Sequence, residues 1–258
     1  MGSLTKFLLA AVLMAGTGYA VAKPHLTVTA DTSKIVDRNL SGFTSIKIGG
    51  PFDVYLTQGP VESVKFEAPG DIPLERIVTE VDGHLLKIHN RHDNWSQGYN
   101  SWYSDKSVWH NHKKIVVYIT AKDLDRISIS GSGDVIFDGG FTTNSLKLRV
   151  RGSGNLQGKV DVKKLTSRIS GSGNMKLSGS AETSVVRVLG SGNFTAGKLV
   201  TVSSAAHVSG SGKAEVNASD KVNAAVRGSV DIRYTGTAKI VNNSKSGSGE
   251  ISRVSSER

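Results

Sequence analysis

The sequence predicts an all-β protein folded as a right-handed parallel β-solenoid with coils of about 19–20 residues. Three observations support this prediction. A Gly-Ser dipeptide returns at a nearly constant interval through the second half of the chain. Apolar residues stand at fixed distances on both sides of it. They alternate with polar neighbours, which is the period of a strand and not of a helix.

The Gly-Ser repeat defines the length of one coil. It begins at residues 131, 152, 171, 190, 210, 228 and 247, so successive repeats are 21, 19, 19, 20, 18 and 19 residues apart. Such spacing is typical of stacked structural units. Two positions before the first glycine the residues are Ile129, Val150, Ile169, Val188, Val208, Val226 and finally Lys245. Four positions after it they are Val135, Leu156, Met175, Phe194, Ala214, Ile232 and Ile251.

The phase of the repeat distinguishes a parallel solenoid from a meander of hairpins. A meander would reverse the residue order on every second strand. In a solenoid each coil lies on the previous one at about 4.8 Å, so equivalent residues stack on each other. Identical residues return here at identical places, which favours the solenoid. The right-handed sense follows from the general preference of parallel connections.

Each Gly-Ser-Gly is predicted to be a corner of the coil. At least one of its glycines is expected to have a positive φ, a conformation in which a Cβ is costly. Asn155, Asn174 and Asn193 follow the corner at the same place in three successive repeats. Their side-chain amides are expected to form a hydrogen-bonded ladder that supports the turn.

Residues 1–22 have the features of a secretory signal peptide. Lys6 is followed by an apolar run from Phe7 to Met14 and by small residues ending at Ala22. We expect cleavage after Ala22 and an exported protein, either periplasmic or extracellular. The alternative, an uncleaved anchor, is disfavoured because the run is too short to span a bilayer. No later segment is apolar enough to be a transmembrane helix, and the chain has no cysteine for disulfides.

Residues 23–120 are predicted to form an N-terminal β region that extends the solenoid less regularly and caps one end. The Gly-Ser-Gly repeat region then occupies residues 121–258. Apolar and polar residues alternate between 43 and 90, with turns at Gly49-Gly50, Gly59-Pro60 and Asp82-Gly83. Only residues 72–80 have a sequence compatible with a short helix.

The two regions differ in charge. Residues 23–120 contain eleven Lys or Arg and eleven Asp or Glu, whereas residues 121–258 contain twenty and eleven, an excess of nine positive charges. The imbalance favours an anionic partner. For an exported protein we expect an anionic polysaccharide or another envelope polymer, and not cellular nucleic acid. The alternative is a solvated basic surface without a partner.

One column of the repeat could contact such a polymer. Arg149, Arg168, Arg187 and His207 stand three positions before the first glycine of their repeats. Because the flanking residues, which are apolar except for Ser167, point inward, these four should point outward, one on each coil. We call them the basic ladder and predict that they bind the ligand, since stacked like charges repel and guanidinium groups suit anions. The alternative is a ladder that salt and nearby acids screen, with its aliphatic stems covering the sheet.

Residues 89–112 contain all 3 tryptophans and four of the 7 histidines. Their Asn, Ser, Gly and Asp content predicts a long loop or an extended hairpin. Its aromatic side chains are predicted to form a surface for sugar stacking or protein docking, and the alternative is that they cap the open end or flank of the solenoid. These residues are Trp95, Tyr99, Trp102, Tyr103 and Trp109. The histidines could bind zinc or copper, but no cysteine or carboxylate pattern supports this, so we expect no metal and no cofactor.

No catalytic motif is found. The Gly-Ser-Gly turns lack the lysine of a phosphate-binding loop, and Gly-x-Ser-x-Gly is absent. Some parallel β-helix proteins process polysaccharides with clustered carboxylates. The aspartates of the repeat region fall at scattered phases: Asp134, Asp138, Asp161, Asp220 and Asp231. We therefore expect that the protein is not an enzyme.

Three sequence features together resemble a known family. They are the opening FTSIKIGGPFDVYLTQG, the runs IVTEVDGHLLKI and KIVVYITAKDLDRISISGSGDV, and the GSGN and GSGD turns. Over about residues 38–253 the chain resembles the putative auto-transporter adhesin, head GIN domain family of bacterial exported proteins. This resemblance implies a β-helix-like fold in the bacterial envelope and supplies no catalytic residues.

The sequence thus predicts a non-enzymatic envelope or extracellular protein, an adhesin-like head domain that binds an anionic surface polymer. Two alternatives stay open. One is a polysaccharide-processing enzyme built on a β-helix, and the other is a purely structural periplasmic protein without a ligand.

Overall fold

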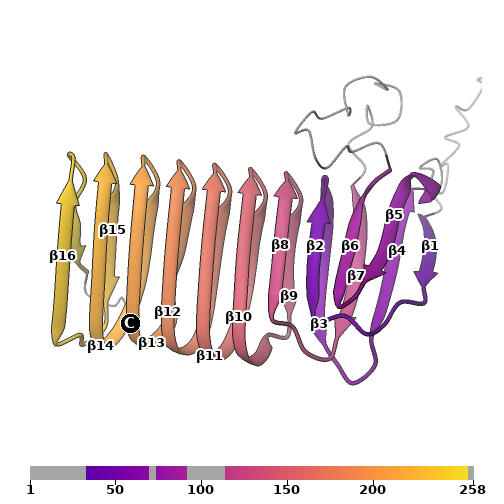
Figure 1. The fold of residues 1–258 in the computed structure, drawn as a ribbon, viewed down its shortest axis with the longest axis horizontal. Helices are drawn as coiled ribbons and strands as arrows, with labels where there is room; N and C mark the ends of the chain where they lie inside the picture. The colour runs from indigo at the N-terminus through magenta and orange to yellow at the C-terminus, as the bar shows by residue number, and fades with distance from the viewer. Residues whose placement is uncertain (1–32, 70–73, 92–113, 255–258) are drawn as a thin grey trace, which may run out of the picture. The chain divides into compact units, whose positions relative to one another are not determined.

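A computed structural model describes residues 33–69, 74–91 and 114–254. Within these ranges nearly every residue belongs to a strand or to a short turn between strands. Seventeen strands are joined in one sheet. Figure 1 shows the strands of the repeat region side by side as successive coils. In the described ranges the one helical turn is η1 (Leu74–Arg76), of the 3-10 type. The prediction of an all-β fold is confirmed.

The repeat region is a stack of parallel strands. All pairings among β8 to β17 are parallel, and each joins residues about one repeat apart. For example, the register of β11 on β12 runs from Asn155 opposite Asn174 to Gly171 opposite Gly190. The predicted parallel solenoid is confirmed, and its right-handed sense stays a prediction. The strands are β8 (Arg126–Gly131), β9 (Asp134–Asp138), β10 (Phe141–Gly152), β11 (Asn155–Gly171), β12 (Asn174–Gly190), β13 (Asn193–Gly210), β14 (Lys213–Gly228), β15 (Asp231–Thr235), β16 (Ile240–Ser246) and β17 (Ile251–Arg253).

The core is the set of apolar columns inside the coils. Ile129, Val150, Ile169 and Val188 stack in register, and each is at most 1% exposed. Burying one side chain of this size stabilises the fold by about 1.5–3 kcal/mol. The column ends at Lys245, which is exposed and lies in register with Val226. A charged residue at an inward position discourages a further strand from adding to this edge.

The two glycines of a corner are needed for different reasons. Gly171 has a φ of +121°, and a Cβ on it would lie 2.5 Å from the carbonyl oxygen of Gly152 in the preceding coil. Gly192 has no such φ, but a Cβ there would lie 2.6 Å from Cγ2 of Ile169 and closer still to the carbonyl oxygen of Gly173. The N–H groups of Ser191 and Gly192 both donate to the Gly171 carbonyl at 3.0 Å. The prediction of a positive φ is confirmed for the first glycine of each corner.

The predicted amide ladder is also present. The Nδ2 groups of Asn155, Asn174 and Asn193 each donate to the side-chain oxygen one coil earlier, at 2.8–2.9 Å. The first acceptor is Oδ1 of Asp134. Lys114 lies beside it, with Nζ 2.9 Å from Asp53 Oδ1 and 3.5 Å from Asp134 Oδ2. The ladder therefore begins at an ion pair and continues through neutral amides.

The strands before residue 122 follow a different spatial order from the chain. The strand β2 (Ser45–Gly49) pairs in parallel with both β6 (Leu85–Asn90) and β8, and β3 (Phe52–Gln58) pairs in parallel with both β7 (Ile115–Ala121) and β9. The coil made by β2 and β3 therefore lies between the repeat region and a coil that the chain forms later.

Antiparallel strands complete this part of the sheet. β1 (Ser33–Arg38) pairs with β4 (Ser63–Pro69), β4 pairs with β7, and β5 (Ile77–Asp82) pairs with β6. The expected helix at 72–80 is wrong beyond the turn η1. The β-branched residues Ile77, Val78 and Thr79 form strand β5 instead, because they pair with β6 and suit a pleated surface.

Candidate anion-binding surface

The four residues of the basic ladder lie where the alternation of the repeat predicts. Arg149 is opposite Arg168, Arg168 is opposite Arg187, and Arg187 is opposite His207, so the ladder crosses strands β10 to β13. All four side chains are exposed. Adjacent parallel strands are about 4.8 Å apart, so the positive groups recur at roughly that interval.

The positive column extends beyond the ladder, into the strands that precede the repeats. Arg149 is opposite Ser128, Ser128 is opposite Lys47 in β2, and Lys47 is opposite Lys87 in β6. Sequence reasoning missed the two lysines because their coils lack Gly-Ser-Gly and do not stack in chain order. Their position between inward apolar residues, as in Ile46-Lys47-Ile48, was the available signal. At the other end His207 is followed by Ala225 and Ser244, so the charge stops there.

More cations flank the ladder on the same outward surface. Residues two positions apart on a strand share a face, which places Lys147 and Arg151 beside Arg149 on β10, and Arg126 is opposite Lys147 on β8. We call the whole set the basic face. It consists of Lys47, Lys87, Arg126, Lys147, Arg149, Arg151, Arg168, Arg187 and His207.

A hollow of about 330 Å³ lies within the basic face. Five cationic side chains line it, together with the hydroxyl-bearing Ser128 and Thr166, and none of its lining residues is acidic. We call it the basic hollow. Its cationic lining consists of Arg126, Lys147, Arg149, Arg168 and Arg187. Leu148 and Ser167 also line it, and because both are buried core-side residues, they supply the strand backbone of its floor.

Like charges crowd the centre of this face. Partial burial lowers the pKa of Arg149, and the neighbouring Arg151, Arg168 and Arg126 lower it further. Burial is also the main reason that the pKa of Lys47 is lowered, followed by the charges of Lys87 and Arg151. The centre of the face is therefore a place where added positive charge is unfavourable.

Carboxylates neutralise one end of the face but not its centre. Lys87 Nζ lies 2.8 Å from Asp82 and 3.4 Å from Glu80, and the hydrogen bond to Asp82 is the main cause of a raised pKa for Lys87. Among the described residues, Arg149, Arg168 and Arg187 have no carboxylate within the 4.0 Å of an ion pair. In the described part of the chain, no ion pair with these three arginines supports the alternative of a ladder screened by neighbouring acids.

The predicted aromatic site lies outside the described residues. Its residues are Trp95, Tyr99, Trp102, Tyr103 and Trp109, and their role in binding stays a prediction. Of the histidines considered for metal binding, only His89 is described, and its Nδ1 lies 2.9 Å from the carbonyl oxygen of Asn90. Within the described ranges no group of three His, Cys, Asp or Glu residues is placed to hold a metal ion. The same ranges contain no helix suited to crossing a membrane.

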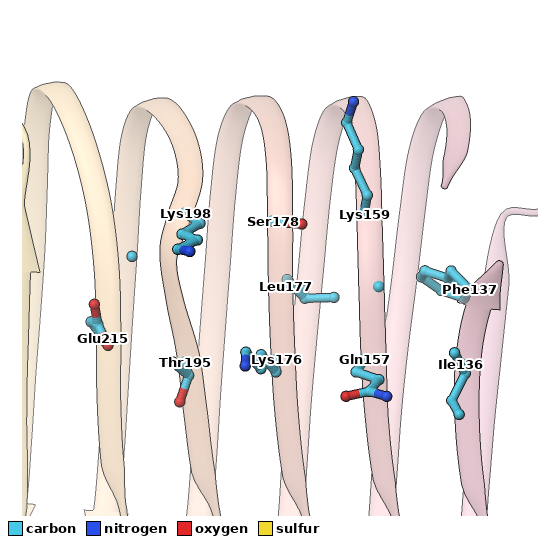
Figure 2. A pocket seen from close by; sticks show the side chains of 12 residues that line it. Ile136, Phe137, Gln157, Lys159, Lys176, Leu177, Ser178, Thr195, Lys198 and Glu215 are labelled. Carbon is cyan, nitrogen blue, oxygen red and sulfur yellow. The ribbon is translucent and has the colours of Figure 1, made fainter. Parts of the chain in front are cut away.

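A second hollow, of about 520 Å³, is lined by residues of β9 and of β11 to β14 (Figure 2). Figure 2 shows Gln157, Lys176, Thr195 and Glu215 side by side on successive strands, as the register also requires. Gly158 contributes to its floor, where a Cβ would overlap the Phe137 side chain. Its lysines Lys159, Lys176 and Lys198 are accompanied by Glu215. Because its charges are mixed, this surface serves as a comparison for the basic face.

Comparison with known proteins connects this fold to bacterial adhesins. A putative adhesin from Bacteroides fragilis has 28% sequence identity and a TM-score of 0.77, and the alignment covers 87% of this chain and 98% of the other. A putative lipid binding protein from Parabacteroides distasonis has 21% identity, a TM-score of 0.66 and the same coverage. A putative adhesin from Parabacteroides merdae has 18% identity, a TM-score of 0.60 and coverage of 86% and 95%. At these last two identities the likeness shows the fold alone.

A comparison with curated protein sequences gives no significant match. A family described as "Putative auto-transporter adhesin, head GIN domain" matches residues 42–238, which is most of the chain. The match covers the strands from β2 to β15 and therefore includes the whole basic face. The chain belongs to the putative auto-transporter adhesin, head GIN domain family.

Proposed function

We propose that the protein is a non-enzymatic, exported, adhesin-like protein that binds an anionic surface polymer, such as an acidic or sulfated polysaccharide, along its basic face. The observation that carries this proposal is the row of basic side chains in register on β10 to β13, in which Arg149, Arg168 and Arg187 form no ion pair with any described residue. A linear polymer also repeats its charges along its length, so it can contact several coils at once. Each contact after the first then benefits from a raised effective concentration.

The concentration of positive charge on the basic face favours the binding of an anion there. Cations at the centre repel each other: after burial, the charges of Arg151, Arg168 and Arg126 are the next causes of the lowered pKa of Arg149. A bound polyanion would relieve this repulsion, and the planar guanidinium group can donate two hydrogen bonds to one sulfate, phosphate or carboxylate. The membership of an adhesin family supports the same kind of role. The Parabacteroides distasonis relative is described as a lipid binding protein. A lipid headgroup offers a similar anion, but it lacks the charges that a linear polymer repeats along its length.

The described aspartates give little support to the alternative of an enzyme. Asp134 accepts from Asn155 and pairs with Lys114, Asp161 accepts from Ser180, and Asp231 accepts from the N–H of Glu250. These carboxylates stabilise the stack of coils and lie on separate coils. Acid–base catalysis of glycoside cleavage needs two carboxyl groups that flank one bond.

The test compares two double variants that each remove two positive charges. Arg168→Ala with Arg187→Ala alters the basic face, and Lys176→Ala with Lys198→Ala alters the second hollow. Binding of heparin, polygalacturonate and neutral dextran would be measured at low and high salt. We expect the arginine variant to lose about tenfold or more in affinity for the charged polymers, the lysine variant to bind like wild type, and high salt to weaken binding.

Two results would contradict the proposal. Equal losses in both variants would mean that any positive charge serves, and unchanged binding in the arginine variant would exclude the basic face as the site. All four altered side chains are exposed, so unfolding should not confuse the comparison. If none of the polymers binds, the alternative of a structural protein without a ligand gains support.

A further inference from the structure

We infer that the basic hollow is a pocket for one tetrahedral oxyanion group, the sulfate or phosphate monoester on a single sugar unit of the polymer. This inference rests on the proposed function and makes it more specific. The basic face as a whole attracts a polyanion, whereas the hollow selects the kind of charged group and sets the position of the polymer along the coils.

The size of the hollow suits one sugar unit. Its volume is about 330 Å³, at the lower end of the roughly 300–1,000 Å³ of small-molecule sites. The lining comes from four successive strands, β8, β10, β11 and β12. The hollow is thus a local feature of the coils at the centre of the basic face, and it does not extend along the whole row.

The lining suits a monoester better than a carboxylate. Four arginines and Lys147 line the hollow from four strands, and Ser128 and Thr166 add hydroxyl groups. A carboxylate is planar and can be satisfied by one guanidinium group. A phosphate monoester presents three strong acceptor oxygens and close to two negative charges, so it can use donors from several sides. A sulfate monoester has the same arrangement of oxygens.

The absence of acids from the lining supports the same assignment. A pocket for a neutral sugar would typically combine donors with acceptors, but none of the lining side chains is a carboxylate or an amide. Arg149 lies at the centre of the row, between Ser128 and Arg168, and its pKa is lowered by burial and by neighbouring cations. A compact anion would offset the part of this shift that the neighbouring cations cause.

Four sugars with the same ring test the chemistry of the pocket. Glucose 6-phosphate, glucose 6-sulfate, glucuronate and glucose would be titrated into the protein at constant ionic strength. We expect both monoesters to bind, glucuronate to bind about tenfold more weakly or worse, and glucose not to bind. Glucuronate binding as tight as that of the monoesters would overturn the inference. Inorganic sulfate should bind more weakly than glucose 6-sulfate, and equal binding would show that no sugar unit is recognised.

Two single variants test the location. Arg149→Ala removes a cation from the hollow, whereas Arg233→Ala removes an exposed arginine of β15, outside both the hollow and the basic face. Monoester binding should be lost in the first variant and retained in the second, and equal effects would overturn the inference. If monoesters fail to bind while Arg168→Ala with Arg187→Ala still weakens polymer binding, the inference is wrong and the proposed function stands. If that double variant has no effect on the polymer, the proposed function itself fails.

Discussion

Three glycine-to-alanine substitutions test why the coils need bare backbone at their corners. Gly139 has a φ of +80° and open space where a Cβ would stand, so Gly139→Ala measures the cost of the backbone conformation alone. Gly192 has no positive φ in the left-handed region, but a Cβ there would collide with the preceding coils, so Gly192→Ala measures the collision alone. Gly171 combines a φ of +121° with a Cβ position 2.5 Å from the Gly152 carbonyl oxygen.

The expected magnitudes follow from these two terms. A non-glycine residue in the left-handed region costs about 1–2 kcal/mol. An extra methyl group in closely packed surroundings costs about 1–3 kcal/mol. If the terms add, Gly171→Ala costs roughly 2–5 kcal/mol, a large part of the 5–15 kcal/mol that stabilises a typical protein. For a chain of this size 1 kcal/mol lowers the Tm by about 2–4 °C, so Gly171→Ala should lower it by about 4–20 °C.

The assay is thermal and urea unfolding of the three variants beside wild type, followed by circular dichroism. The free energy of unfolding should fall most in Gly171→Ala, and by smaller amounts in Gly139→Ala and Gly192→Ala. If Gly171→Ala and Gly139→Ala are equally stable, the close approach of successive corners adds no cost. The coils would then be packed more loosely than the stacked corners require, and this reasoning would be refuted.

Three further changes test other parts of the stack. Asn174→Ala removes two amide hydrogen bonds of the ladder. In urea unfolding it should lower the free energy of unfolding by about 1–2 kcal/mol. An unchanged urea midpoint would show that these exposed amides bind water equally well. Lys245→Val completes the inward apolar column at the last described coil. The variant should self-associate in gel filtration as its concentration rises. A monomer at all concentrations would show that the lysine does not protect this edge. Hydrogen bonding to Asp53 is the main cause of a pKa for Lys114 above its usual 10.5, so its stabilisation is fully present below pH 10.5 and is lost as the pH rises through the folded-state value. Lys114→Met should therefore lower the urea midpoint at pH 8 and make it less sensitive to pH between about 10 and 12, and a wild-type profile in the variant would contradict this.

The repeat made much of the fold predictable. Identical residues at identical places in the repeat can stack only if the coils are parallel and in register. The sequence could therefore assign Gly171 to a corner, Asn174 to the amide ladder and Arg168 to an outward column. The alternation around Arg168 also predicted its exposure, because a strand has only two faces. These predictions needed no knowledge of side-chain positions.

The remaining features depend on contacts that leave no periodic signal. The coil of β2 and β3 lies between segments far away in the chain, so Lys47 could not be placed next to Ser128 from spacing alone. Residues 77–82 pair with β6 as a strand, although the segment from 72 to 80 is compatible with a helix, because tertiary pairing outweighs local preference. The basic hollow depends on how Arg126, Lys147 and their neighbours lie across four strands, which a sequence pattern does not specify.

The most direct test of the account is to map a bound sulfated oligosaccharide by backbone amide NMR shifts. The basic face should respond, with the largest and saturable shifts on the strand segments around Arg149, Arg168 and Arg187, and the shifts should reach Lys47 as the oligosaccharide is lengthened. The segments around Lys176 and Lys198 should stay unchanged. Saturable shifts centred on those lysines, or weak shifts spread over every lysine and arginine, would contradict the claim that the stacked coils present one anion-binding face.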